Sequence, residues 1–334
     1  MLNPRYTNDG KNIVKFNNVQ QQAKEDILRK IKEGIYTYEN VYCPICDVEK
    51  QSFQILAQKD RYGLDCTTVI CDKCGLLITN PRLSQFSYNQ FYEKEYRQLY
   101  VGNEKASYDF FNDQYKHGLS IIKYICKNSS LNLKDKYVLE VGCGAGGILA
   151  AFKDHGANVL GLDLGEEYLK YGIENYGLTL EKGSIHDYQF TKVPDIIIYS
   201  HVLEHVLDLS RELERIKQIS HASTLVYIEV PGIKNIHNAY FGNFLLYLQN
   251  AHTYHFSLNT LSVLFSKNGF TKITGNENIQ SLFCFQSQSE NHNEKFINEY
   301  KSIIKYLKFY ELLYKCGYTY FYKCLKKIMR LIRN

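Results

Sequence analysis

The sequence predicts an α/β fold in which a mostly parallel, seven-stranded sheet is covered by helices on both faces. Seven apolar runs bounded by turn residues are expected as strands, at 136–141, 158–164, 178–184, 195–201, 224–231, 270–277 and 281–287. Helical patterns separate the first six. Runs such as Ile196-Ile197-Ile198 lack the alternation of a half-exposed strand, which favours a parallel sheet. Only residues 278–280 separate the last two strands, so these must form an antiparallel hairpin.

A glycine-rich turn follows the first expected strand, in the run Glu140-Val141-Gly142-Cys143-Gly144-Ala145-Gly146-Gly147. Glycines let the backbone approach a ligand without an intervening Cβ, and an acid roughly twenty residues further on can accept the hydroxyls of a ribose. Asp163, at the end of the second expected strand, has that position. The pattern predicts a site for a nucleoside-bearing cofactor.

Two cofactor classes fit the glycines alone. Gly142, Gly144 and Gly147 satisfy the G-x-G-x-x-G pattern of nicotinamide dinucleotide sites, so an oxidoreductase stays open as an interpretation. Glu140 favours the other class. A pyrophosphate is anionic and needs no acid beside it, whereas a carboxylate at this position suits a cationic ligand.

The run Glu140 to Gly144 resembles motif I of class I S-adenosylmethionine-dependent methyltransferases, and Asp163 resembles their ribose-binding acid. The similarity extends over roughly residues 105–287 and implies the seven-stranded, Rossmann-like class I sheet. It also implies the cofactor, S-adenosyl-L-methionine, and the residues that hold it. Glu140 is expected near the methionine amino group, Asp163 at the ribose, and Ser184 and Ile185 beside the adenine, although the family commonly has an acid where Ser184 stands. The remaining expected contacts are Gly142, Cys143, Gly144, Gly146 and His201.

Methyl transfer from a sulfonium is an in-line displacement, so the enzyme must position the nucleophile and remove its proton. His201 and His205 directly follow the fourth expected strand, and a helix beginning near Val202 would place both on one face. The alternative interpretation is that these histidines only make hydrogen bonds, while Leu203, Val206 and Leu207 pack in the core.

A third candidate for catalysis is His255, in the segment 250–257, where Ser257 is expected to cap the following helix. The segment resembles the His-Glu-His motif of sugar C-methyltransferases but has Asn250 and Ala251 in place of the leading pair. This difference favours methylation of a hydroxyl over carbon methylation. The Asp/Asn-Pro-Pro-Tyr motif that accompanies methylation of base nitrogens is also missing after the fourth strand, where Tyr199-Ser200-His201 stands.

Four cysteines form two C-x-x-C pairs, Cys43 with Cys46 and Cys71 with Cys74. Each pair can point two thiolates at one tetrahedral ion, so a Zn²⁺ ribbon is expected, with strands near 51–56 and 67–70 and with Cys66 as a strand residue. A redox-active pair and unligated core thiols are the alternatives. The ribbon and the segment after it are similar to the leader of bacterial methyltransferases, many of which are found with sugar and polysaccharide biosynthesis.

Four segments are therefore expected: a helical leader at 1–40, a zinc ribbon at 41–82, a methyltransferase domain with its leading helices at 83–290, and a basic amphipathic helical tail at 291–334. The chain carries +5, but residues 294–334 hold ten Lys and Arg against three Glu, a net +7. Residues 1–293 thus carry −2, and no nucleic acid partner is expected. The tail is expected as two helices, split at Gly317, that either pack on the body or contact an anionic membrane.

These observations predict a methyltransferase that acts on a hydroxyl of a sugar, nucleotide-sugar or glycan precursor. No long apolar run and no cleavable leader is visible, so a cytoplasmic location is expected, with membrane association at the inner face as the alternative that the tail leaves open. A zinc-ribbon RNA methyltransferase and a non-catalytic cofactor-binding scaffold are the two rival functions.

Overall fold

The chain divides into two compact units. The computed structural model describes residues 1–46, 52–102, 106–285 and 296–317. Unit 1 consists of Met1–Asn89, Pro231–Leu261 and Lys295–Asn334, and unit 2 of Gln90–Val230 and Ser262–Glu294. Pro231–Leu261 thus packs with unit 1, although it falls inside the segment expected as the methyltransferase domain. The four expected segment boundaries stay a prediction.

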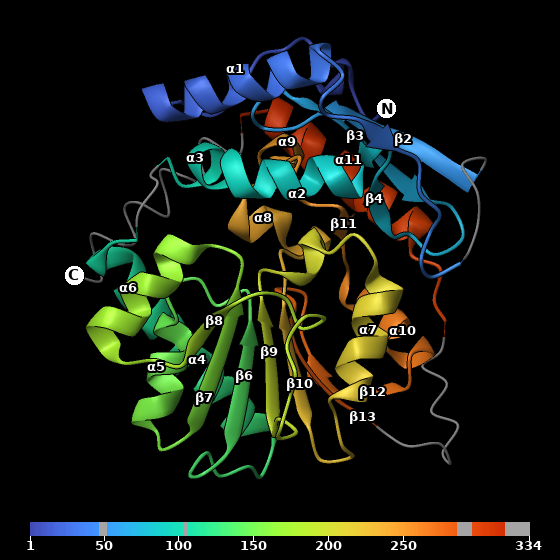
Figure 1. Ribbon diagram of the computed structural model, residues 1–334. Helices are drawn as coiled ribbons and strands as arrows, with labels where there is room; N and C mark the ends of the chain where they lie inside the picture. Colours follow the sequence, from blue (N-terminus) through green and yellow to red (C-terminus); the bar gives the residue numbers. More distant parts are fainter. Residues whose placement is uncertain (47–51, 103–105, 286–295, 318–334) are drawn as a thin grey trace, which may run out of the picture. The chain divides into compact units, whose positions relative to one another are not determined.

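Unit 2 is built on a seven-stranded sheet in the order β12-β13-β10-β9-β6-β7-β8 (Figure 1). β6, β7, β8, β9 and β10 run parallel, and β13 is antiparallel to both β10 and β12. The strands are β6 (Tyr137–Val141), β7 (Asn158–Asp163), β8 (Leu180–Lys182), β9 (Ile196–Ser200), β10 (Leu225–Glu229), β12 (Phe270–Gly275) and β13 (Gln280–Phe285). All seven expected strands are present, and the predicted class I, Rossmann-like fold is confirmed.

Helices cover both faces of this sheet (Figure 1). α4 (Tyr108–Asn128), α5 (Gly147–Asp154) and α6 (Glu166–Tyr176) lie on one side, and α7 (Leu209–Gln218) and the end of α10 (Leu258–Lys267) on the other. α3 (Tyr96–Tyr100) precedes α4. Side-chain caps fix the starts of two of these helices. Ser107 accepts a backbone N–H bond at the start of α4, and Asp208 accepts one at the start of α7.

Unit 1 contains a four-stranded antiparallel sheet in the order β11-β4-β3-β2. Its strands are β2 (Phe53–Lys59), β3 (Asp65–Cys71), β4 (Leu77–Thr79) and β11 (Tyr254–His255), and β1 (Tyr38–Glu39) pairs with β5 (Arg82–Leu83). The helices are η1 (Pro4–Tyr6), α1 (Asn18–Lys32), η4 (Ile233–Asn235), α8 (Ile236–Ala239), α9 (Phe244–Tyr247) and α11 (Tyr300–Lys315). α2 (Gln85–Lys94) begins in unit 1, and its residues from Gln90 onward belong to unit 2. The core joins all three segments of the unit, for example through Leu56, Phe244 and Leu307.

The prediction of a helix that begins near Val202 is wrong. Residues 203–205 form only a 3₁₀ turn, η3 (Leu203–His205), and α7 starts at Leu209. His201 has a φ of 57°, in the left-handed region, and its N–H donates to the carbonyl of Glu229 at 2.7 Å. A residue in this conformation turns the chain out of any continuous helix, so His201 and His205 do not share a helix face.

The first helix of the expected tail is α11, which begins at Tyr300 and ends at Lys315, before Gly317 at a φ of 74°. The second expected helix lies outside the described residues. Among the helices that the structure describes, none combines the length and the apolar character needed to cross a membrane.

Candidate active site

The glycine loop that follows β6 has no room for side chains. Gly142, Gly144 and Gly146 all have positive φ, at 71°, 57° and 77°. A Cβ on Gly142 would lie 2.4 Å from Cγ2 of Val202, in the chain that leaves β9. The loop is therefore pressed against the carboxyl end of the neighbouring strand, at the edge of the sheet where open α/β folds bind their ligands.

Asp163, at the carboxyl end of β7, holds the loop in place. Its Oδ2 accepts the N–H of Gly144 at 2.8 Å, and its Oδ1 accepts the N–H of Gly165 at 2.6 Å. Arg97, from α3, donates to Oδ1 at 3.1 Å, and its guanidinium lies 3.8 Å above the centroid of the Tyr168 ring. A carboxylate has about four acceptor positions, so these three donors leave roughly one for a ligand.

Glu140 is a buried carboxyl group in β6, with 1% of its surface exposed. Its Oε2 has no hydrogen-bond partner among the described residues. Burial raises the pKa of Glu140 well above its usual value, and the nearby Asp163 charge raises it further. An acid that is buried in this way without a partner fits a cationic or strongly donating ligand group.

Gln114, in α4, fastens the glycine loop to the helix. Its Nε2 donates to the carbonyl of Cys143 at 3.2 Å, and its Oε1 accepts the N–H of Gly147 at 3.3 Å. Cys143 itself is fully buried, and its Sγ would be 2.6 Å from a Cβ on Gly161. The side chain of Cys143 is therefore packed against β7.

A second group of polar side chains lies at the carboxyl ends of β9 and β10. His117, in α4, places Nε2 at 3.0 Å from Oε2 of Glu229 and at 3.3 Å from Oγ of Ser200. The Tyr227 hydroxyl donates to the same Glu229 oxygen at 2.7 Å. Burial raises the pKa of Glu229, but the hydrogen bonds from His117 and Tyr227 and the nearby His201 outweigh it and lower that pKa overall.

His201 faces two carboxylates. Its Nδ1 lies 3.7 Å from Oε1 of Glu204, and its Nε2 lies 4.0 Å from Oε1 of Glu229. Burial lowers the pKa of His201, yet the two carboxylates more than compensate and raise it above its usual value. More than half of the side-chain surface of His201, 53%, is exposed.

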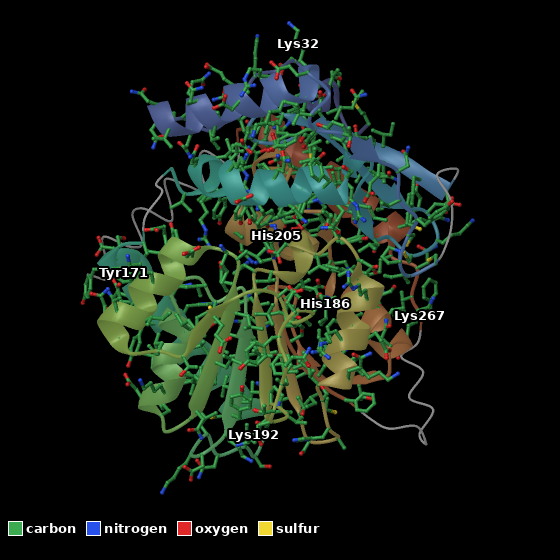
Figure 2. All side chains as sticks on the ribbon, viewed as in Figure 1. Lys32, Tyr171, His186, Lys192, His205 and Lys267 are labelled. Carbon is green, nitrogen blue, oxygen red and sulfur yellow. The ribbon has the colours of Figure 1, made fainter. Side chains whose placement is uncertain are left out.

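His205 lies at the same edge of unit 2, opposite the edge that carries Lys192 (Figure 2). Its ring meets Tyr92 and Tyr96 edge-on, at centroid distances of 5.8 and 5.7 Å. The Tyr92 and Tyr96 rings are stacked at 4.3 Å, and Tyr100 continues the stack at 5.7 Å from Tyr96 with an interplanar angle of 3°. These tyrosines form a continuous aromatic stack beside an imidazole.

Three other residues were also expected at the site. His255 belongs to unit 1, where β11 pairs it with Leu77 and its ring lies 5.1 Å from that of Tyr247. Ser184, after β8, donates to Asp187 at 2.6 Å, so an acid does stand near the position where the family commonly has one. Ile185 is fully buried.

The four expected zinc ligands meet within unit 1. The Sγ atoms of Cys43, Cys46, Cys71 and Cys74 all lie within 4.8 Å of one another, with 3.6 Å between Cys43 and Cys74. A tetrahedral zinc with Zn–S bonds of 2.3 Å requires separations of about 3.8 Å, so the cluster fits the ion. Cys66 is a buried residue of β3, as expected, and its Sγ lies 3.9 Å from Oγ1 of Thr79.

Comparison with known proteins gives the enzyme class. Residues 115–274 match the family model described as a methyltransferase domain. The chain carries a methyltransferase domain. The expected S-adenosylmethionine-dependent methyltransferase is thereby confirmed, and the nicotinamide interpretation of the glycines loses its support. No curated protein matches the chain.

Solved structures of three methyltransferases resemble the chain at low similarity. S-adenosylmethionine-dependent methyltransferases from Mesorhizobium loti (15% identity, 49% of this chain and 94% of theirs, TM-score 0.39) and, as a putative enzyme, from Listeria monocytogenes (16%, 51% and 99%, 0.41) are two of them. The third is magnesium protoporphyrin IX methyltransferase from Synechocystis, with bound SAH (16%, 59% and 97%, 0.39). The family match and the strand order identify the methyltransferase domain.

Sequence reasoning missed four residues of this site, namely Arg97, Gln114, His117 and Glu229. Glu229 carried a usable signal, because it is an acid at the carboxyl end of an expected parallel strand. Gln114 and His117 lie three residues apart on one face of α4, and nothing local marks them as different from other polar helix residues.

Replacing Gln114 by alanine tests whether its two hydrogen bonds to Cys143 and Gly147 hold the glycine loop. Two neutral hydrogen bonds are lost, so we expect the free energy of unfolding to fall by about 1–2 kcal/mol. Amide hydrogen exchange of residues 143–147 should become faster than in the wild type. Asp113→Ala, on the exposed side of the same helix, is the matched control and should leave this exchange unchanged. Equal protection of the loop in both variants would show that Gln114 does not fasten it.

Proposed function

We propose that the protein transfers the methyl group of S-adenosylmethionine to a hydroxyl of a sugar or glycan precursor. The observation that carries the acceptor class is the stack of Tyr92, Tyr96 and Tyr100 beside His205. Sugars present apolar C–H faces that pack on aromatic rings, and an imidazole next to such a surface can take a hydroxyl proton.

In this proposal the cofactor lies along the glycine loop. Glu140 supplies a carboxylate for the α-ammonium group, and the backbone of Gly142, Cys143, Gly144 and Gly146 passes under the methionine and ribose. Asp163 offers its remaining acceptor position to a ribose hydroxyl, and a second position becomes free if Arg97 moves away. Ser184 and Ile185 flank the adenine. The close contact of Gly142 with Val202 supports a methyl group delivered next to His201.

The reaction needs one proton acceptor. The hydroxyl oxygen attacks the methyl carbon while the C–S bond breaks, and the bonding electron pair stays on sulfur, which becomes the neutral thioether of S-adenosylhomocysteine. The hydroxyl proton passes to an imidazole, for which His205 and His201 are the candidates in unit 2. His255, which belongs to unit 1, was the third residue for which we expected a catalytic role, and that role stays a prediction.

The raised pKa of Glu140 predicts pH-dependent cofactor binding. At pH values below this raised pKa, the Glu140 carboxyl group is protonated in the free protein. In the complex it is ionised, because it faces the ammonium group of the cofactor. Cofactor binding in this pH range must therefore release a proton. Affinity for S-adenosylhomocysteine should therefore rise with pH until that pKa is passed. Calorimetry in two buffers of different ionisation enthalpy measures the proton.

Glu140→Gln should abolish this proton release and weaken binding about 10- to 100-fold, because a hydrogen bond to a charged group contributes about 1.5–3 kcal/mol. Proton release that persists in the variant would exclude Glu140 as its source.

Methyl transfer can be followed directly with labelled cofactor. The purified protein should bind S-adenosylhomocysteine and not NADH, and should label a hydroxyl in a panel of free sugars, nucleotide-sugars and oligosaccharides. Asp163→Ala should lose most cofactor binding and keep its zinc, and Asp163→Asn should lose less, since one acceptor oxygen remains. Labelling of RNA instead would support the zinc-ribbon RNA methyltransferase, and cofactor binding with no labelled acceptor would favour the scaffold.

We also propose that Cys43, Cys46, Cys71 and Cys74 hold one structural Zn²⁺. All four ligand positions are sulfur, and three of the four cysteines are buried, which supports a closed site without a coordinated water. The second cysteine pair is in contact with the start of α11. The N–H of Glu299 donates to the carbonyl of Cys74 at 3.1 Å, and Nδ2 of Asn298 donates to the carbonyl of Asp72 at 2.8 Å.

Cys71→Ser should reduce the zinc content from about one ion per chain and loosen α11, because the turn that holds the helix loses its metal. Metal analysis and limited proteolysis at the C-terminal helix provide the measurements. Cys66→Ser, a buried thiol of the same strand that lies against Thr79, should retain both zinc and protection. An unchanged zinc content in Cys71→Ser would contradict the ligand set.

A further inference from the structure

Three elements of unit 2 bring metal-binding atoms together at the carboxyl ends of β9 and β10. A ring nitrogen of His117, a ring nitrogen of His201 and a carboxylate oxygen of Glu229 lie within 4.8 Å of one another. His117 comes from α4, His201 directly follows β9, and Glu229 ends β10 beside Ser200 in the sheet register. Two imidazoles and one carboxylate form a ligand set that binds divalent first-row cations.

The surroundings of this cluster support ligands that are already oriented. Metal-bound imidazoles usually direct their second nitrogen at a carboxylate, and ligating carboxylates are themselves hydrogen-bonded. His201 turns Nδ1 toward Glu204, which is buried, and leaves Nε2 facing Glu229. Glu229 in turn accepts the Tyr227 hydroxyl at 2.7 Å. Both features are expected of a site in which His201 and Glu229 share an ion.

The conformation of His201 is an independent observation. A non-glycine residue at a φ of 57° is uncommon, and such backbone strain concentrates at functional sites. In this conformation the imidazole faces Glu229, at the end of β10, with Nε2 at 4.0 Å from Oε1. With 53% of its side chain exposed, His201 leaves coordination positions open for a ligand from outside the protein.

We propose that His117, His201 and Glu229 bind one divalent first-row transition cation, separate from the four-cysteine site. The role of this cation rests on the proposed function: its open positions take the acceptor's hydroxyl oxygen together with a neighbouring oxygen and lower the pKa of that hydroxyl. His201 is then a ligand, and His205, beside the stacked tyrosines, receives the proton. The competing explanation is that His117 and Glu229 form only the 3.0 Å hydrogen bond that is seen between them.

Mn²⁺ is the probe that separates the two sites, because it prefers nitrogen and oxygen ligands and does not compete for zinc bound to four thiolates. The full-length, zinc-loaded protein is titrated with Mn²⁺, and the loss of the free-ion electron paramagnetic resonance signal counts bound ions. We expect about one Mn²⁺ per chain. His201→Ala removes an exposed side chain, so it should fold normally and bind at least about tenfold more weakly, as should His117→Ala.

His221→Ala is the matched control, since His221 is exposed and precedes β10 without facing the cluster, and it should bind Mn²⁺ as the wild type does. No binding by the wild type, or equal binding by His201→Ala and His117→Ala, would overturn the proposal. The titration needs no acceptor, so it is independent of the proposed function. Mn²⁺ binding without sugar methylation would contradict the proposed function alone. Sugar methylation without Mn²⁺ binding would contradict the cation site alone.

Discussion

The close approach of the Gly142 backbone to the side chain of Val202 is the constraint on which the rest of the candidate site depends. Because β6 and β9 are neighbours in the sheet, the chains that leave them must share the same small space above its edge. They can do so only where one has no side chain, and a Cβ on Gly142 would meet Val202 at 2.4 Å. The path of each chain is therefore set by the other, and the cofactor loop and the histidine segment are positioned together.

Four carboxyl groups around this edge differ in the hydrogen-bond donors and charged neighbours that the protein provides. Asp163 has two backbone donors and Arg97, and Glu229 has Tyr227 and His117. Glu140 has a buried oxygen for which the described residues provide no partner. Since a buried acid without a partner costs free energy in the isolated protein, its most economical explanation is a ligand that compensates it on binding. Glu204 lies between His201 and His205, within 3.8 Å of both rings.

The sheet was predictable because its central parallel strands leave a local signature, a continuous apolar run bounded by turn residues, as Ile196-Ile197-Ile198 does in β9. The hairpin of β12 and β13 followed from the length of its connection. The turn after β9 was not predictable in the same way. Leu203 and Leu207 fit a helical spacing, but the hydrogen bond from His201 to Glu229 joins two strands and overrides it. Gln114, His117 and Arg97 act across distances of 29 to 112 residues in the sequence, and nothing in their neighbours announces such contacts.

Unit 1 shows how a distant segment of the chain can pack against the turn that carries the second cysteine pair. Gly75 follows the second cysteine pair at a φ of 89°, and a Cβ there would lie 2.8 Å from the backbone of Glu299 and Tyr300. Glu299 occupies the N-cap position of α11, and its carboxylate accepts hydrogen bonds from Lys234 and Ser257. One residue thus joins the cysteine turn, η4, the start of α10 and α11. Because all four elements meet at Glu299, the placement of α11 depends on the folding of the cysteine turn. The sequence between the cysteine turn and α11 need not encode that placement.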